Sequence, residues 1–219
     1  MLSPLPPAAV RLSALFEQAR TAKPTHLPGG LDGRGDRWAS QGPLRTGHRV
    51  DLGCGPTVFA AARQALMQWR QFPSWASVCD ASSAHLKQRP APPAVGQDVC
   101  VTVRGAGLWW SNPARVYEVI DKPDSFSVAY VTLPGHVCRG EERFRLTRDA
   151  DGRVWYDVRA DSVLVHPLAR LAGPLARRRQ KEFARDSLAA MRRIVSAADL
   201  IPRPASSRSK LSAIQLAGI

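Results

Sequence analysis

The chain has 219 residues, which is enough for one domain of ordinary size or for two small ones. Hydrophobic residues make up 44% of it, so global disorder is excluded, and no apolar run approaches the roughly 20 residues of a membrane-spanning helix. The formal net charge is +13, yet residues 48–166 are nearly neutral, with 14 basic and 12 acidic residues, while residues 167–219 carry a net +8, so a basic cleft over the whole protein is not expected.

Residues 1–47 are predicted to be an irregular N-terminal extension with one short helix. Apolar side chains recur at helical spacing over 8–19, and residues 21–47 are rich in Gly, Pro, Arg and Asp. A charged start followed by an apolar segment is not present, so we expect a cytoplasmic protein without a secretory signal. At the other end, residues 199–219 are expected to be a basic tail without regular structure.

The central part, residues 48–198, is predicted to be one domain that begins with a helix over 57–70. A short strand is expected at 77–80, followed by a proline-containing loop over 82–97. From 98 to 165 the apolar period changes to two, and turn-forming residues interrupt it at short intervals. Five antiparallel strands with tight connections are expected, centred on 99–103, 114–121, 126–132, 138–146 and 154–162.

A long helix is predicted from 168 to about 198, with a break at Gly173-Pro174. Its apolar stripe contains Ala184, Leu188, Met191 and Val195, and most of its basic residues fall off that stripe, which places the surplus charge on the outer face. The order of helix, strands and long C-terminal helix predicts an α+β fold with a helix on one face of an antiparallel sheet.

The four cysteines, Cys54, Cys79, Cys100 and Cys138, lack the spacing of a metal site. We expect free thiols packed in the core, no bound metal and no cofactor.

One motif, a glycine-rich turn, is typical of a class of enzymes. Asp51-Leu52-Gly53-Cys54-Gly55 is similar to the glycine-rich turn of S-adenosylmethionine-dependent methyltransferases, and Asp80 follows the next strand as their ribose-binding acid does. That fold needs a crossover helix between successive parallel strands, and residues 98–165 contain none. We therefore disfavour this alternative and interpret the glycines as a turn before the 57–70 helix.

Several segments, in this order, resemble uncharacterised protein family 0548, a family of unknown function, over about two thirds of the chain. They are Asp51-Leu52-Gly53-Cys54-Gly55-Pro56, Gln68-Trp69-Arg70-Gln71-Phe72, Gly105-Ala106-Gly107-Leu108-Trp109-Trp110-Ser111-Asn112-Pro113, Tyr130-Val131-Thr132-Leu133-Pro134-Gly135-His136, Arg139-Gly140-Glu141-Glu142-Arg143-Phe144 and Val154-Trp155-Tyr156-Asp157-Val158.

The resemblance implies a helix-grip fold like that of START-like lipid-transfer domains, polyketide cyclases and the birch-pollen allergen. In that superfamily a curved antiparallel sheet wraps a long C-terminal helix and leaves an apolar cavity between them. The sequence departs from the family near its N-terminus, where Thr25-His26-Leu27-Pro28-Gly29-Gly30 replaces the family's Tyr-Pro-Glu-Val-Gly stretch.

Glu142 is the first candidate for a functional residue. It shares a strand face with Cys138, Phe144 and Leu146, so on the concave side of the sheet it would be a carboxyl group in an apolar wall with a raised pKa. Such a group binds a polar ligand head or acts as a general acid or base; the alternative is a structural pair with an arginine. Its neighbour Glu141 is expected to point the other way, into solvent.

The other candidates are a histidine and four aromatic residues. His136 follows a Pro-Gly turn and titrates near neutrality unless it only stabilises the turn. Tyr130 and Tyr156 share the inward parity of their strands, and Trp109 and Trp110 either line the cavity mouth or fill the core.

Three functions remain open. The first is binding of a small hydrophobic molecule or lipid in the cavity, and the second is an acid–base enzyme of the cyclase or hydrolase kind that uses Glu142, His136 and a tyrosine. The third is contact with an anionic surface or nucleic acid through the basic helix, although nucleic acid is not an expected partner because basic faces of amphipathic helices are usually solvated. The lack of a nucleophile motif favours binding over catalysis.

Overall fold

The computed structural model describes residues 2–29, 44–83, 89–105 and 107–199. Its helices are α1 (Ala9–Thr21), α2 (Pro56–Met67), α3 (Pro167–Leu171) and α4 (Gly173–Asp199). Its strands are β1 (Leu2–Ser3), β2 (Leu44–Cys54), β3 (Ala76–Asp80), β4 (Asp98–Gly105), β5 (Leu108–Lys122), β6 (Ser125–Thr132), β7 (Cys138–Arg148) and β8 (Arg153–Leu164). The expected tail at 199–219 lies almost wholly outside the described residues.

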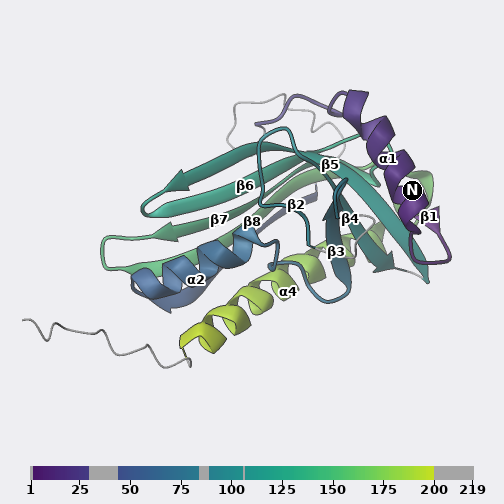
Figure 1. Cartoon of the computed structure of the whole chain (residues 1–219). Helices are drawn as coiled ribbons and strands as arrows, with labels where there is room; N and C mark the ends of the chain where they lie inside the picture. The colour runs from purple at the N-terminus through teal and green to yellow at the C-terminus, as the bar shows by residue number, and fades with distance from the viewer. Residues whose placement is uncertain (1, 30–43, 84–88, 106, 200–219) are drawn as a thin grey trace, which may run out of the picture.

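The strands form one sheet in the order β2-β8-β7-β6-β5-β4-β3, with β1 paired to β5. Every ladder within the described residues is antiparallel, and the curved sheet is long enough to hold α2 and α4 side by side on one face (Figure 1). α1 packs on the opposite face, where Leu12 and Phe16 cover Cys100. The predicted α+β class, a helix-grip sheet with a long C-terminal helix, is confirmed.

The antiparallel ladders argue against the methyltransferase alternative, in agreement with the sequence analysis that disfavoured it. Gly53 and Gly55 adopt φ of 116° and 100° in the turn from β2 into α2, where a side chain would be strained. Asp80 is buried, and its two carboxylate oxygens accept hydrogen bonds from the backbone of Ser83 and Ala91, each at 2.8 Å. It therefore organises the loop after β3, and the strands in the described part of the chain include no parallel pair that could form a cofactor crevice.

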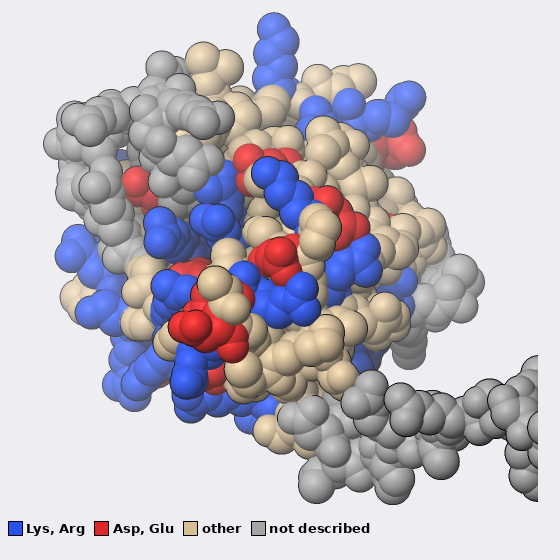
Figure 2. Space-filling model, turned by 90° about the vertical axis from the view of Figure 1, so that its left-hand side faces the viewer, with Lys and Arg blue, Asp and Glu red and all other residues tan. Residues whose placement is uncertain are grey.

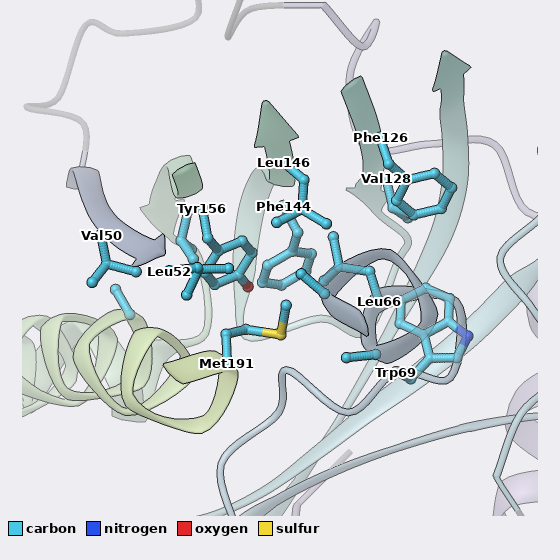
Figure 3. Packing of buried hydrophobic residues seen from close by; sticks show 14 of the residues in the cluster. Val50, Leu52, Leu66, Trp69, Phe126, Val128, Phe144, Leu146, Tyr156 and Met191 are labelled. Atoms are coloured by element: carbon cyan, nitrogen blue, oxygen red, sulfur yellow. The ribbon is translucent and has the colours of Figure 1, made fainter. Parts of the chain in front are cut away.

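A solid core fills the space between the sheet, α2 and the second half of α4. Figure 3 shows Met191 of α4 beneath Tyr156 of β8 and Phe144 of β7, with Leu66 of α2 beside them. These four side chains are fully buried. The apolar stripe predicted on the long helix is thus the face that packs on the sheet.

β2 is the main element that the sequence pattern did not reveal. It begins at Leu44, so the boundary expected between residues 47 and 48 lies inside a strand that pairs with β8 along its length. Its arginines obscure the alternation: the Arg49 guanidinium lies 4.4 Å from the ring centre of Trp155, on the face away from the core. When the outer side chains of a strand are charged, its sequence pattern is similar to that of a polar loop.

A β-bulge at Tyr117 changes which residues of β5 face the core. The register shifts between Val116 and Glu118, so Val119 turns inward and Glu118 turns outward, where it pairs with Arg143 at 3.1 Å. Uninterrupted alternation from Val116 would have kept Glu118 on the inner face, so the bulge reverses the faces of the second half of β5.

The remaining predictions on helices and thiols are mixed. The long helix is broken at Ala172, between α3 and α4, one residue before the expected position. All four cysteines are free, but Cys54 is exposed, so the expectation that each packs in the core was wrong for that residue. None of the helices in the described ranges is long and apolar enough to cross a membrane.

Gly140 allows β7 and β8 to approach closely, and its substitution tests this packing. A Cβ atom there would lie 2.3 Å from the Asp161 carbonyl oxygen, whereas one at Gly47 of β2 would meet nothing within 4 Å. We expect Gly140→Ala to lower the free energy of unfolding by about 3 kcal/mol, the upper range for overpacking. Gly47→Ala, the matched strand control, should be neutral or slightly stabilising in urea titrations. Equal effects of the two variants would contradict this account.

Candidate functional site

An aromatic cluster ends the solid core on the side toward the start of α4. Phe183 of α4 contacts Phe72 and Phe144, with ring centres 5.5 and 6.4 Å apart, and Trp75 packs edge-on against Phe183 at 6.0 Å. α2 and its following turn fill the space on one side of these rings. On the other side, the sheet and the helices enclose a cavity instead.

This cavity has a volume of about 600 Å³ and lies between the inner faces of β4–β8 and the segment from α3 to the first half of α4. Most of its lining is apolar or aromatic. The apolar and aromatic lining residues include Trp75, Val101, Val103, Trp110, Tyr130, Val137, Ala160, Leu164, Leu168, Ala169, Leu175, Ala176 and Phe183.

Glu142 lies in this apolar wall, as its strand parity predicted. Its Oε2 accepts a hydrogen bond from the Tyr130 hydroxyl on the neighbouring strand β6. Burial raises the pKa of Glu142 to about 7, and the hydrogen bond from Tyr130 opposes part of this rise. The carboxyl group therefore exchanges a proton near neutral pH and either donates or accepts a hydrogen bond inside the cavity.

His136 and Cys138 contribute two further polar groups to the lining. The Cys138 backbone N–H donates to His136 Nδ1 at 2.9 Å, and burial lowers the pKa of the imidazole to about 3. The ring is therefore neutral, with its proton on Nε2, which agrees with the alternative in which His136 stabilises the turn and not with titration near neutrality. Burial also raises the pKa of the Cys138 thiol to about 12, which leaves it protonated and unreactive.

The aromatic candidates separate into two groups. Trp110 and Tyr130 line the cavity, and the indole N–H of Trp110 donates to the Gly105 carbonyl at 3.2 Å. Trp109 alternates with Trp110 along β5 and is not part of the lining. Tyr156 is fully buried in the solid core, where its hydroxyl forms a 2.9 Å hydrogen bond with Ser187 of α4. The structure thus brings together Glu142, Tyr130, His136 and Trp110, and places Trp109 and Tyr156 elsewhere.

The mouth of the cavity carries charged residues that the sequence interpretation placed on the outer face of the helix. Arg178 and Arg179 of α4 both pair with Glu182, at 2.8 and 3.0 Å, and all three line the cavity together with Arg104 of β4. The Arg179 guanidinium also lies 4.9 Å from the ring centre of Trp75. The helical stripe formed by positions 172, 176, 179 and 183 is the sequence signal that indicates this inward face.

Glu141 points away from the cavity side chains, as expected, but it is not solvated. It is buried on the outer face of β7, where its Oε2 accepts hydrogen bonds from the Tyr117 hydroxyl at 2.5 Å and from the Gly29 backbone N–H at 3.0 Å. Glu141 therefore ties the N-terminal segment to the sheet.

No metal centre is formed among the residues that the structure describes, because no three His, Cys, Asp or Glu side chains gather in one place. The chemistry available in the cavity includes the buried Glu142 carboxyl group, the Tyr130 hydroxyl, the neutral His136 imidazole and a large apolar surface. This arrangement can hold an apolar molecule and form hydrogen bonds with one polar group on it.

Comparisons with known proteins show the family. The family profile described as a domain of unknown function, DUF1990, matches residues 38–190. A UPF0548 protein of Deinococcus radiodurans is 34% identical over 82% of this chain and 91% of its own length. A UPF0548 protein of Arabidopsis thaliana is 32% identical over 68% of this chain and 72% of its own length.

Among solved structures, the chain is similar to a START superfamily protein from Mycobacterium smegmatis. The TM-score is 0.43 and the identity 15%, over 71% of this chain and 99% of the other. This likeness concerns the course of the backbone and carries no information on the ligand.

The titration of Glu142 gives a stability test. Because its folded pKa of about 7 lies above the ordinary value of 4.5, its contribution is fully present below about pH 4.5 and is lost as the pH rises through 7. Urea unfolding at several pH values should show the wild type losing about 3 kcal/mol relative to Glu142→Gln between pH 4 and 8. Tyr130→Phe removes the hydrogen bond that lowers the pKa of Glu142, so the pH midpoint of the stability loss should move upward in this variant. A pH-independent difference between wild type and Glu142→Gln would contradict the assignment.

Proposed function

The chain belongs to the DUF1990 family, and from the geometry of its cavity we propose that it binds a small hydrophobic molecule whose polar group is held by Glu142. The observation that carries this proposal is the size and lining of the cavity. At about 600 Å³ it falls within the range of pockets that enclose small ligands, and it is far larger than the voids that close packing leaves in a core.

The position of the polar groups supports a ligand that enters with a polar end inward. Glu142 and Tyr130 lie on adjacent strands of the wall, and His136 adds an N–H donor at the same end of β7. The charged side chains Arg178 and Glu182 are at the mouth, where water reaches them. An apolar body in the cavity, with one hydroxyl, carbonyl or amine directed at Glu142, satisfies both regions.

A second candidate function is acid–base catalysis in the same cavity. It is favoured by the pKa of Glu142, because a general acid or base works best when its pKa is close to the working pH. A bound compound that leaves chemically changed from the wild type, but unchanged from Glu142→Gln, would establish it. Release of the same compound unchanged from both proteins would leave binding as the function.

Filling the cavity tests the binding proposal. Ala176 of α4 lines the cavity and is half-buried, so Ala176→Phe should place a ring in the ligand space at little cost to folding. We expect the affinity for the neutral fluorescent probe N-phenyl-1-naphthylamine to fall by at least about tenfold, since a ring of this size removes contacts worth about 1.5–3 kcal/mol.

The matched control is Ala197→Phe, on an exposed position of the same helix outside the lining. It should bind the probe as the wild type does, and native mass spectrometry of the purified wild type should detect a co-purified compound that the filled variant lacks. Equal probe binding by all three proteins would overturn the proposal.

A further inference from the structure

The segment that borders the cavity mouth presents apolar side chains to solvent. Val165, Leu168, Leu171 and Leu175, in and around α3, are 44, 49, 85 and 48% exposed. The three leucines follow one another at helical spacing, and Leu168 and Leu175 also line the cavity. We call these four residues the apolar rim. Exposed aliphatic residues grouped in this way mark an interaction surface.

The charges around the apolar rim have one sign. Residues 165–181 contain five basic and no acidic residues. Arg170 and Arg177 are both exposed, and Arg178 and Arg179 share Glu182 as their partner. A partner that fits this segment must therefore offer negative charge around an apolar interior.

The opposite end of the molecule differs. There the β5–β6 and β7–β8 hairpins meet the turn before α2, and acidic and basic side chains are interleaved over the surface (Figure 2). Ion pairs link Arg63 to Asp121, Arg148 to Asp124 and Arg153 to Asp51. The unbalanced positive charge at the cavity end is thus a local property of α3 and the start of α4, and charge complementarity selects an anionic partner for that end only.

We propose that the apolar rim docks onto the surface of a bilayer that contains anionic phospholipids, with the cavity mouth facing the membrane. Leu171, the most exposed of the four, enters the acyl boundary, and Arg170 and Arg177 lie at the level of the phosphates. In this orientation a hydrophobic molecule passes from the lipid into the cavity without crossing water. Docking itself does not depend on what the cavity binds.

Vesicle co-sedimentation tests the docking. The full chain should bind vesicles of phosphatidylcholine with 30% phosphatidylglycerol, and binding should fall with added salt and be weak on phosphatidylcholine alone. Leu171→Ser should weaken binding by about tenfold, and Arg177→Ala by about fivefold.

The control is Val95→Ser, which removes another exposed aliphatic side chain, 66% exposed, in the loop before β4 and should bind as the wild type does. Leu171 is outside the cavity lining, so the affinity of Leu171→Ser for N-phenyl-1-naphthylamine in vesicle-free buffer should not change. Failure of the wild type to bind the probe would contradict the cavity proposal, whereas failure of the wild type to bind vesicles would contradict docking.

Two outcomes would overturn the docking proposal. The first is vesicle binding that is absent, or that Leu171→Ser does not weaken. The second is a wild type that is dimeric by light scattering and becomes monomeric in Leu171→Ser without any vesicle binding, which would make the apolar rim a contact between two copies of the chain.

Discussion

The contact of Phe183 with Phe72 and Phe144 determines what the rest of the molecule can do. These rings join α4, the turn after α2 and the middle of the sheet at one point. Because aromatic rings are large and rigid, they hold the helix away from the sheet on the side where α2 is missing. The cavity lies beyond these rings, and the solid core fixes the position of the sheet and the helix that bound it. The cavity is therefore a consequence of how far α2 extends.

The mouth and the interior of the cavity differ in their charged groups. The arginines at the mouth remain in contact with water and share Glu182, so their charge is screened. Glu142 is surrounded by apolar side chains and Tyr130, and burial is the dominant influence on its pKa. A carboxyl group in such surroundings has a proton affinity that depends on what occupies the space beside it. Under the proposed function, ligand binding and protonation of Glu142 are thus coupled.

The sequence predicted the fold well where one apolar period persists. The helix over 57–70, four of the five strands from 98 to 165 and the break near Gly173 follow from spacing and breakers alone. The start expected at 114 for the other strand was wrong, because β5 begins at Leu108 and continues through Pro113. Prediction from the sequence failed where the alternation of apolar and polar residues is interrupted. Arginines conceal the alternation of β2, and the bulge at Tyr117 reverses the faces of the second half of β5. Glu142 and Tyr130 were predictable from parity in β6 and β7, which contain no bulge. The burial that neutralises His136 was not, because it depends on elements distant in sequence.

The break at Ala172 separates two kinds of helix. α4 beyond Phe183 is committed to packing by Met191 and Val195, so most changes there reduce stability. α3 and the first turns of α4 contact the rest of the protein at fewer points, such as Arg179 with Trp75 and Gln180 with Ser162, so most substitutions of their exposed residues are expected to carry a small stability cost. Natural selection can therefore vary the residues that face the ligand while the other half keeps the protein folded.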